Sequence, residues 1–409
     1  MTDNSGIKKI LYVENGIGYG GAIICLRHLV RNLDRTRYLP MVVTGRTGPQ
    51  YEEIAHEALW KHIPDRHLDT VGLKAKAASI EWLSKRPALR FLVDQIIARA
   101  DDLCNFLPFF LQLLWSAWRF KADLIHANNE PLCNRAALLV AKVLGIPSIS
   151  HVRGDPGGSH SVHWTYSLPD QFISVSHWVA NGMRDSLSIP AKKISVVYDG
   201  IALDQLDLSA DGTLFRQQFN ISKDAFAVGL VGLLIPWKGQ HVFIDTAKIL
   251  KTAIPNLKML IIGGTPDDCI DYEAELKKRA IDEQLTDTVF FTGHICEMPN
   301  AYNGLDIVVS ASTSPEPLGT VVIESMAIGC ALIVPNHGGG AEMVEHNKTG
   351  LHFKSKDAAS LAESILTLYK NPKVAQQLGH QAKSKALSIF SIEHHTQQIE
   401  KVYQNLLIQ

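Results

Sequence analysis

Short runs of β-branched and aliphatic residues alternate with longer helical patterns along almost the whole chain, and this alternation is the feature that most restricts the fold. It favours an α/β fold with parallel sheets, because a parallel neighbour strand can be reached only through a crossover connection. The alternation occurs in two blocks, and 409 residues suffice for two or three domains. We therefore expect two α/β lobes with a cleft between them, a usual place for a small-molecule site.

The first block is expected to contain strands at 9–13, 39–44, 124–127, 148–151, 171–175 and 194–197, with helices that include 22–33 and 135–144. Gly145 would cap the C-terminus of the second of these helices. The second block is expected to contain strands at 227–233, 258–262, 288–292, 307–310 and 331–334, and helices at 240–252 and 358–369. A last helix, 392–407, would follow Ser391 as its N-cap. The boundary between the blocks lies near residues 200–222.

The overall charge is nearly balanced, with 40 Lys and Arg against 41 Asp and Glu. A dedicated nucleic-acid binder usually has a strong basic excess, so no nucleic-acid partner is expected. Residues 1–200 hold 23 basic and 18 acidic side chains, whereas the remainder holds 17 and 23. This split arises either by chance or because the first lobe meets an anionic partner, such as a lipid surface or a charged acceptor.

The six cysteines are scattered, with no C-x-x-C pair and no spacing typical of zinc ligands. The first apolar run, Ile10 to Val13, is too short for the core of a signal peptide. We therefore expect a cytoplasmic protein with reduced thiols.

Residues 103–118 (LCNFLPFFLQLLWSAW) form a strongly apolar stretch. It is shorter than the roughly 20 apolar residues of a transmembrane helix, and Asn105, Pro108 and Gln112 interrupt it. Basic residues flank it on both sides: Lys74, Lys76, Lys85, Arg86, Arg90, Arg99, Arg119 and Lys121. The stretch is therefore either a buried core helix or an interfacial helix that docks the first lobe on a membrane. Charges introduced at Phe109 and Leu113 would distinguish the two.

A glycine-rich loop, Gly16-Ile17-Gly18-Tyr19-Gly20-Gly21, follows the first expected strand and satisfies G-x-G-x-x-G. Such a loop at the start of a helix favours an anionic ligand. A dinucleotide site would also need an acidic residue at the end of the second strand, where Thr44-Gly45-Arg46 stands instead. Three interpretations stay open: a turn that only fits the fold, a substrate or phosphate site, and an NADP site in which Arg46 meets the 2′-phosphate.

Glu316 and Glu324 lie on either side of Gly319-Thr320-Val321, which precedes a helical pattern. Backbone N–H groups at the start of a helix suit a phosphate or sugar hydroxyls. Glu324, about one turn into the helix, can accept hydrogen bonds from a vicinal diol such as ribose, and Glu316 can accept them from sugar hydroxyls. On their own, two glutamates at this spacing are more often solvated charges.

Residues 314–330 resemble the E-x7-E signature of the retaining glycosyltransferases of family 4, which have the GT-B fold. Four further segments resemble conserved parts of that family: 231–239 (VGLLIPWKG), 260–264 (LIIGG), 291–294 (FTGH) and 338–342 (GGGAE). In the first lobe, Gly20, Gly21, His126, His151 and residues 197–201 follow the family's order. The similarity covers essentially the whole chain and is weakest between 45 and 120.

The resemblance implies two Rossmann-like lobes in the GT-B architecture: an acceptor-binding lobe at 1–205, a nucleotide-sugar-binding lobe at 206–388, and a C-terminal crossing helix at 389–409 that packs back on the first lobe. It implies transfer of a sugar, with retained anomeric configuration, from a nucleotide diphosphate sugar to a hydroxyl of a glycan or lipid-linked acceptor. Such a hexosyltransferase would act in polysaccharide or glycolipid biosynthesis without a cofactor. We expect it in the cytoplasm or peripherally on the inner face of the cell membrane.

By the same resemblance, His151, Lys238 and Glu316 are the candidate catalytic residues. A fixed ammonium at Lys238 would stabilise the diphosphate that leaves in the transition state. Glu324 would bind the ribose, Glu316 the donor sugar, and His151 with Arg153 would face that sugar. The remaining candidates for donor contact are Gly20, Gly21, Gly232, Gly293, His294, Leu318, Gly319, Thr320 and Val321.

Leu233 stands where the family commonly has an arginine, so half of the usual cationic clamp is missing. Either Arg153 or a backbone dipole compensates for it, or activity is reduced. No D-x-D occurs, so no metal site is expected. The acceptor hydroxyl would attack on the face of the sugar from which the phosphate departs, and that phosphate would take the hydroxyl proton. Two alternatives stay open: a degenerate transferase fold that acts as a binding or assembly protein, and an NADP-linked oxidoreductase.

Overall fold

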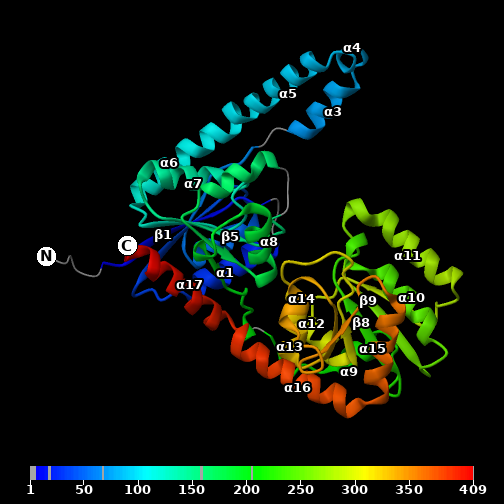
Figure 1. The fold of residues 1–409 in the computed structure, drawn as a ribbon. Helices are drawn as coiled ribbons and strands as arrows, with labels where there is room; N and C mark the ends of the chain where they lie inside the picture. Colours follow the sequence, from blue (N-terminus) through cyan, green and yellow to red (C-terminus); the bar gives the residue numbers. More distant parts are fainter. Residues whose placement is uncertain (1–5, 17–19, 67–68, 157–159, 204–205, 409) are drawn as a thin grey trace. The chain divides into compact units, whose positions relative to one another are not determined.

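The computed structural model describes residues 6–16, 20–66, 69–156, 160–203 and 206–408, which form two compact units (Figure 1). Unit 1 comprises Met1–Ser174, Gly182–Ser195 and Ile399–Gln409, and unit 2 comprises Val175–Asn181 and Val196–Gln398. The lobe boundary expected after residue 205 falls on a residue outside the described part of the chain. Residues 196–203 group with unit 2 in the structure.

Unit 1 is built on a seven-stranded sheet in the order β3-β2-β1-β4-β5-β6-β7. Strand β1 is parallel to both of its neighbours, β2 and β4. The strand order reverses between β1 and β4, because β2 and β3 lie on one side of β1 and the later strands lie on the other. The strands are β1 (Lys8–Glu14), β2 (Tyr38–Thr44), β3 (Leu59–His62), β4 (Leu124–Ala127), β5 (Ser148–Val152), β6 (Gln171–Ser174) and β7 (Ile194–Val196).

The helices of the first part of the chain cover this sheet and extend beyond it. They are α1 (Gly21–Asn32), α2 (Pro49–Glu52), α3 (Thr70–Ser79), α4 (Glu81–Ser84), α5 (Pro87–Asp101), α6 (Leu107–Phe120), α7 (Arg135–Leu144) and α8 (His177–Leu187). A π-helical turn, η2 (Asp102–Phe106), joins α5 to α6. The inner faces of α6 and α7, through Leu113 and Val140 among others, pack with Leu11 and Ile125 of the sheet in one apolar cluster.

Helices α3, α4 and α5 form an antiparallel hairpin that extends away from the sheet of unit 1 (Figure 1). The hairpin is held together by packing of α3 and α4 on α5, and it joins the body of the unit through η2 and α6.

Unit 2 is built on a six-stranded sheet in the order β10-β9-β8-β11-β12-β13, which reverses between β8 and β11. Its strands are β8 (Phe226–Val231), β9 (Leu257–Ile262), β10 (Val289–Gly293), β11 (Ile307–Val309), β12 (Ala331–Pro335) and β13 (Leu351–Phe353). Its helices are α9 (Gly212–Gln218), α10 (Gln240–Leu250), α11 (Ile270–Asp282), α12 (Met298–Gly304), α13 (Thr320–Ile328), α14 (Gly338–Met343), α15 (Ala358–Lys370) and α16 (Pro372–Ile389). The final helix, α17 (Ile392–Leu407), begins in unit 2 and ends in unit 1.

Successive residues of the unit 2 strands enter two separate apolar clusters. Val228 and Ile261 belong to one cluster, while Ala227 and Leu260 belong to the other. Because neighbouring side chains on a strand point to opposite faces, both faces of this sheet are buried under helices, as in other parallel sheets.

The expected α/β class with two parallel sheets is confirmed, and each of the eleven expected strands is present within two residues of its expected ends. Gly145 adopts the left-handed conformation (φ 67°) of a helix C-cap, and the Ser391 hydroxyl accepts the backbone N–H of His394 as an N-cap does. Strands β3 and β13 were not expected. Both are short edge strands of four and three residues, too brief to show a clear alternation of polar and apolar positions.

The apolar stretch 103–118 is helical throughout, and only one face of it is buried. Its first residues form the π-helical turn η2, and α6 begins at Leu107 with Pro108 in its first turn. Helix α6 is amphipathic: Phe109 and Leu113 are buried in unit 1, while Leu111 and Trp115 are exposed. The expectation that charges at Phe109 and Leu113 would test membrane docking is therefore wrong. Both side chains are buried, and charges there would disrupt the core of unit 1.

Candidate active site

Lys238 lies in the connection that leaves the carboxyl end of β8. Strand β8 ends at Val231, and the short turn Pro236–Lys238 is followed by Gly239 in a left-handed conformation (φ 77°). A Cβ atom at position 239 would collide with the carbonyl oxygen of Ala311, so only glycine allows this close approach to the residues after β11. The lysine is thereby brought beside the β11 loop.

The side chains of Lys238 and Glu316 form an ion pair, with 2.7 Å between Nζ and a carboxylate oxygen. The other carboxylate oxygen of Glu316 accepts a short hydrogen bond from the Ser312 hydroxyl. The Lys238 ammonium also lies 4.6 Å from the centre of the Trp237 ring. Lys238 and Glu316, which are 78 positions apart, are thus two predicted site residues that the fold brings into direct contact.

The backbone of the Glu316 loop is held by the start of α14. The N–H of Gly339 donates to the carbonyl oxygen of Glu316 over 2.7 Å. A Cβ atom on Gly338 would lie 2.8 Å from the backbone N and O of Glu316. An added Cβ on Gly339 would also collide with the carbonyl oxygen of Pro317. Gly338 and Gly339 therefore let α14 approach this loop closely. The imidazole of His337 bonds the Ser355 hydroxyl, and burial lowers its pKa.

Glu324 lies in the second turn of α13, whose N-cap is Gly319 and whose first residue is Thr320. The Tyr302 hydroxyl donates to a carboxylate oxygen of Glu324 over 2.7 Å. Burial raises the pKa of Glu324, although the tyrosine hydrogen bond opposes this shift. Leu318 and Val321 are half-buried and Thr320 is exposed, so the start of the helix is accessible beside a partly desolvated carboxylate.

Glycines occupy the carboxyl ends of β8, β9 and β10. Gly232 (φ 151°) lies against the Lys238 side chain, where an added Cβ would be 3.6 Å from the lysine stem. The N–H of Gly263 donates to the carbonyl oxygen of Gly293, the last residue of β10. His294 follows and is exposed. These residues line one edge of the sheet, where ligands of parallel α/β folds bind.

Lys238 and Glu316 flank the point of that edge at which the strand order reverses. Lys238 follows β8 and Glu316 follows β11. These two strands are neighbours in the sheet, although β9 and β10 come between them in the chain. The crevice at such a reversal is the usual ligand site of an open parallel sheet. The arrangement offers a cation, two carboxylates and a helix N-terminus, which suits a nucleotide with attached sugar.

In unit 1, His151 and Arg153 belong to a buried polar network at the ends of β4 and β5. The His151 ring lies 3.3 Å from His126 Nε2 and 3.3 Å from an Arg153 nitrogen. Arg153 also donates to the backbone and side-chain oxygens of Asn128. His151 is fully buried. The network positions both residues, and their contact with a donor sugar stays a prediction.

The same network continues to the C-terminal helix. The Tyr403 hydroxyl lies 2.6 Å from His126 Nδ1 and 2.9 Å from the Tyr12 hydroxyl. A second buried group, the Glu14 carboxylate, accepts hydrogen bonds from Asn128, from Asn129 and from the N–H of Gly16. Burial raises the pKa of Glu14. The sequence indicated neither Tyr403 nor Glu14, because the side chains that they bond lie far away in the chain.

The glycine-rich loop is described only in part. Gly20 caps the start of α1 and Gly21 is its first residue, with open space around both Cα atoms. The predicted Ile17-Gly18-Tyr19 portion lies outside the described residues. Arg46, the candidate for a 2′-phosphate, donates from Nε to the carbonyl oxygen of Gly16.

The described residues contain no group of three or more His, Cys, Asp or Glu side chains that could hold a metal ion. Metal-independent transfer stays a prediction.

Known proteins similar to this chain point to one family. The model of "Glycosyltransferase Family 4" matches residues 19–205, and that of "Glycosyl transferases group 1" matches residues 211–385. A lipopolysaccharide 1,2-N-acetylglucosaminetransferase of Salmonella typhimurium is 28% identical over 53% of this chain and 58% of its own length. A capsular polysaccharide biosynthesis glycosyltransferase, CapM of Staphylococcus aureus, is 25% identical over 58% of this chain and 61% of its own.

The chain thus spans between half and two thirds of the length of these curated relatives. Among solved structures, HepE of Anabaena, crystallised with UDP, superposes with a TM-score of 0.79 at 22% identity over 97% of this chain and 100% of that one. The observed sheets match the GT-B fold of such neighbours. The two adjoining family matches and the shared fold identify this chain as a member of the group 1, family 4 glycosyltransferases.

Proposed function

We propose that this chain transfers a sugar from a nucleotide diphosphate sugar to a hydroxyl of a glycan or lipid-linked acceptor, with retained anomeric configuration. The observation that carries the proposal is the Lys238–Glu316 pair at the reversal of the unit 2 sheet, beside the α13 N-terminus. Relatives named for lipopolysaccharide and capsule synthesis support the class of acceptor.

The roles follow from charge and position. Lys238 would turn from Glu316 to the donor diphosphate, where a fixed cation stabilises the charge that develops on the leaving group. Glu316, released by the lysine, would accept hydrogen bonds from the donor sugar. Glu324 would accept them from the ribose diol, and the start of α13 would offer backbone N–H groups to the sugar.

The reaction that we propose forms one bond and breaks one on the same face of the sugar. The bond from the anomeric carbon to the diphosphate oxygen breaks, the acceptor oxygen bonds to that carbon, and the hydroxyl proton passes to the departing phosphate. Lys238 acts by neutralising the leaving group and does not itself accept that proton.

The test is thermal unfolding of the full chain with UDP, GDP, ADP and NADP, followed by nucleotide release from the matching sugar nucleotide with a glycan acceptor. Ligands that bind the native state raise the melting temperature by mass action. HepE, crystallised with UDP-glucose, makes the uridine donor the first to try. We expect one nucleoside diphosphate to stabilise the chain and Lys238→Ala and Glu324→Ala to abolish that effect. Lys373→Ala and Glu363→Ala, exposed positions of unit 2, are the matched controls.

Two outcomes would contradict the proposal. Stabilisation by a nucleoside diphosphate without any turnover would favour a binding or assembly protein, the alternative that Leu233 motivates. Stabilisation by NADP alone would favour the oxidoreductase.

We further propose that the protein associates peripherally with an anionic membrane through unit 1. Twelve of the 28 exposed large apolar side chains of the described residues lie between 73 and 118. Eight of the twelve recur at spacings of three, four or seven along α5, η2 and α6, which places them on one helical face. We call these eight the apolar stripe: Leu89, Leu92, Ile96, Leu103, Leu107, Leu111, Trp115 and Trp118.

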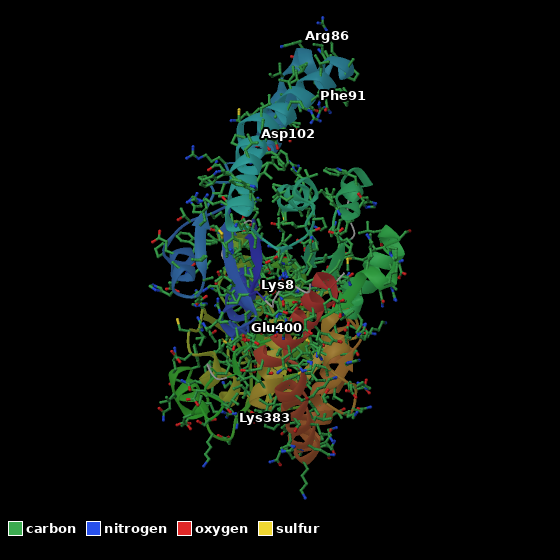
Figure 2. The ribbon with its side chains drawn as sticks, turned by 90° about the vertical axis from the view of Figure 1, so that its left-hand side faces the viewer. Lys8, Arg86, Phe91, Asp102, Lys383 and Glu400 are labelled. Carbon is green, nitrogen blue, oxygen red and sulfur yellow. The ribbon has the colours of Figure 1, made fainter. Side chains whose placement is uncertain are left out.

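The charge around the apolar stripe supports an anionic membrane as its partner. Residues 70–121 carry eight Lys and Arg against four Asp and Glu. Arg86 and the exposed Phe91 lie at the far end of the hairpin, and Asp102 lies nearer the body of unit 1 (Figure 2). Apolar and tryptophan side chains with flanking basic ones suit the interface of an anionic bilayer. No helix in the described ranges is long and apolar enough to cross a membrane.

Flotation with phosphatidylglycerol vesicles, compared with phosphatidylcholine vesicles, tests this association. We expect the full chain to float with the anionic vesicles and less so at high salt. The double variant Leu111→Glu/Trp115→Glu should lose flotation, whereas Ile281→Glu, an exposed apolar position in unit 2, should keep it. Absence of flotation would overturn the association. A change in oligomeric state of the double variant would instead assign the stripe to a second copy of the chain.

A further inference from the structure

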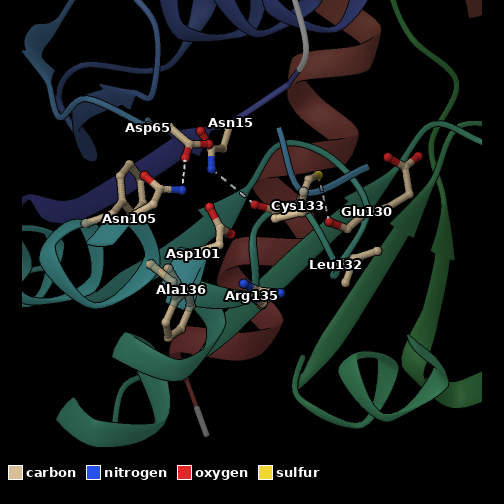
Figure 3. Close-up of a pocket in the computed structure, with 12 residues that line it drawn as sticks. Asn15, Asp65, Asp101, Asn105, Glu130, Leu132, Cys133, Arg135 and Ala136 are labelled. Carbon is tan, nitrogen blue, oxygen red and sulfur yellow. Dashed lines mark hydrogen bonds between the residues drawn. The ribbon is translucent and has the colours of Figure 1, made fainter. Parts of the chain in front are cut away.

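A pocket of about 550 Å³ lies in unit 1 between the base of the helical hairpin and the loops of the sheet (Figure 3). Five of its polar side chains come from four separate segments: Asn15, Asp65, Asp101, Asn105 and Glu130. Its volume is in the range of small-molecule pockets. Nothing in the donor site of unit 2 contributes to its lining.

The pocket occupies the ligand position of the unit 1 sheet. Asn15 follows the last residue of β1, and Glu130 lies three residues beyond the end of β4. Strands β1 and β4 are the neighbours between which the strand order reverses. The crevice outside the carboxyl ends of the strands at such a reversal is where open parallel sheets bind ligands.

Hydrogen bonds orient the amides that line the pocket. Asn105, which is 3% exposed, accepts the backbone N–H of Arg66 over 2.6 Å and donates to Asp65 over 2.7 Å. Asn15 donates to the carbonyl oxygen of Cys133 over 3.3 Å. These polar groups are therefore held before a ligand arrives, which lowers the entropic cost of binding.

Phe106 and Phe109 add an apolar wall to the pocket. A wall of this kind beside oriented polar groups suits a sugar ring, which presents both C–H and hydroxyl groups.

The charged side chains that line the pocket are mostly acidic. Asp65, Asp101 and Glu130 bring three carboxylates. Among the described residues of the lining, Arg135 is the single Lys or Arg, and its guanidinium is engaged by Asp102 at 3.3 Å and lies 4.7 Å from the centre of the Phe106 ring. The pocket therefore presents hydrogen-bond acceptors to a ligand. Its negative potential disfavours a ligand that is itself an anion.

We propose that this pocket binds the saccharide of the acceptor, and that it accepts neutral or amine-bearing sugars and rejects sugars that carry a carboxylate or phosphate. The inference rests on the proposed function and adds to it the site and the charge class of the acceptor. The apolar stripe begins on the same helices, since Asp101 ends α5 and Phe109 lies in α6. A lipid attached to a saccharide in the pocket would thus have an apolar surface close by.

The test measures direct binding by ligand-observed NMR of methyl glycosides of glucose, glucosamine, glucuronic acid and glucose 6-phosphate to the full chain with UDP. We expect the first two to bind and the last two not to bind. Leu132→Trp, at a partly exposed lining position, should fill the pocket and lower saccharide affinity at least tenfold. Val143→Trp, at an exposed position on α7, is the matched control.

Charge selectivity has its own variant. Asp65→Asn with Glu130→Gln removes two carboxylates while keeping side-chain size, and we expect it to let the glucuronide bind. Equal binding of neutral and acidic glycosides by the unaltered chain would overturn the proposal, as would unchanged affinity in Leu132→Trp or no binding of any glycoside. UDP stabilisation is measured in the same samples, so failure of this inference leaves the nucleotide result intact, whereas absence of UDP, GDP and ADP binding would refute the proposed function itself.

Discussion

Leu233 is 51% exposed beside Gly232, at the carboxyl end of β8. Its backbone carbonyl accepts a hydrogen bond from Gln240, so the backbone at this position is held and the side chain is left accessible. A larger, charged side chain can therefore be introduced there without disturbing the core.

We expect Leu233→Arg to raise the rate of sugar transfer by about ten- to hundredfold, because a second cation would share the charge of the leaving diphosphate. The measurement is kcat for nucleotide release at saturating donor. Leu214→Arg, an exposed position on α9, controls for added charge. An unchanged kcat in Leu233→Arg would mean that another group already supplies the second cation.

Glu324 gives a prediction about pH. Burial raises its pKa, so the folded chain keeps a proton that the unfolded chain releases. The favourable contribution of this proton is fully present below the unfolded pKa and is lost as the pH rises through the folded pKa. Glu324→Gln cannot ionise, and we expect it to resist urea better than the unaltered chain at neutral pH, with the difference vanishing in acid.

Nucleotide binding should change in the opposite direction with pH. The ionised Glu324 is the better acceptor for a ribose diol, so nucleotide affinity should fall on acidification, beginning above the ordinary pKa of glutamate. Titration of nucleotide affinity against pH checks this, and the Glu324→Gln variant should give a weaker and flatter profile. The same pH profile in both proteins would exclude Glu324 from the binding site.

At the scale of elements, the end of α17 is tied to the unit 1 sheet by polar contacts. Tyr403 is fully buried and its hydroxyl bonds both Tyr12 and His126. The backbone N–H of Asp34 donates to Glu400 of the same helix over 2.9 Å. These contacts complement the apolar packing that holds an amphipathic helix in place.

Tyr403→Phe keeps the ring and removes the hydroxyl, so the buried Tyr12 hydroxyl and the buried His126 ring each lose a hydrogen-bond partner. We expect a loss of about 1–3 kcal/mol in the free energy of unfolding. Chemical denaturation measures it, and Tyr369→Phe, whose half-buried ring packs edge-on against Phe226, serves as the control. Equal stability of the two variants would show that the Tyr403 hydroxyl contributes nothing net.

Local patterns predicted eleven of the thirteen strands of the described chain and the most regular helices, but not the helical hairpin α3–α5. The periodic signal was strong where residues such as those of β4 or α7 are buried on a regular face. In the hairpin the apolar residues are largely exposed, so their pattern does not reflect core packing. The same exposure explains why residues 103–118 read equally well as core or interface: α6 is apolar on both its buried and its exposed face.

For the whole molecule, the two candidate sites lie in different units, with Lys238 and Glu316 in unit 2 and the 550 Å³ pocket in unit 1. Ligands that bind native structure suppress local opening where they bind. We expect UDP to slow hydrogen exchange at residues 232–240 and 312–324, and methyl glucoside to slow it around residues 101–109 and 130–136. Exchange mass spectrometry of the full chain measures both, with β13 as an internal reference. Protection of the unit 1 segments by UDP alone would assign the pocket to the donor instead.

The sequence by itself determined the α/β class, the two sheets and the residue types of the candidate donor site, because strand and helix periods, glycine turns and a family signature are all local patterns. The tertiary structure decided which of those residues meet. Lys238 contacts Glu316 only because β8 lies beside β11, and the unit 1 pocket exists only because β1 lies beside β4 under the base of the hairpin. Strand order and the depth of burial depend on packing between distant segments, and no periodicity within a single segment encodes them.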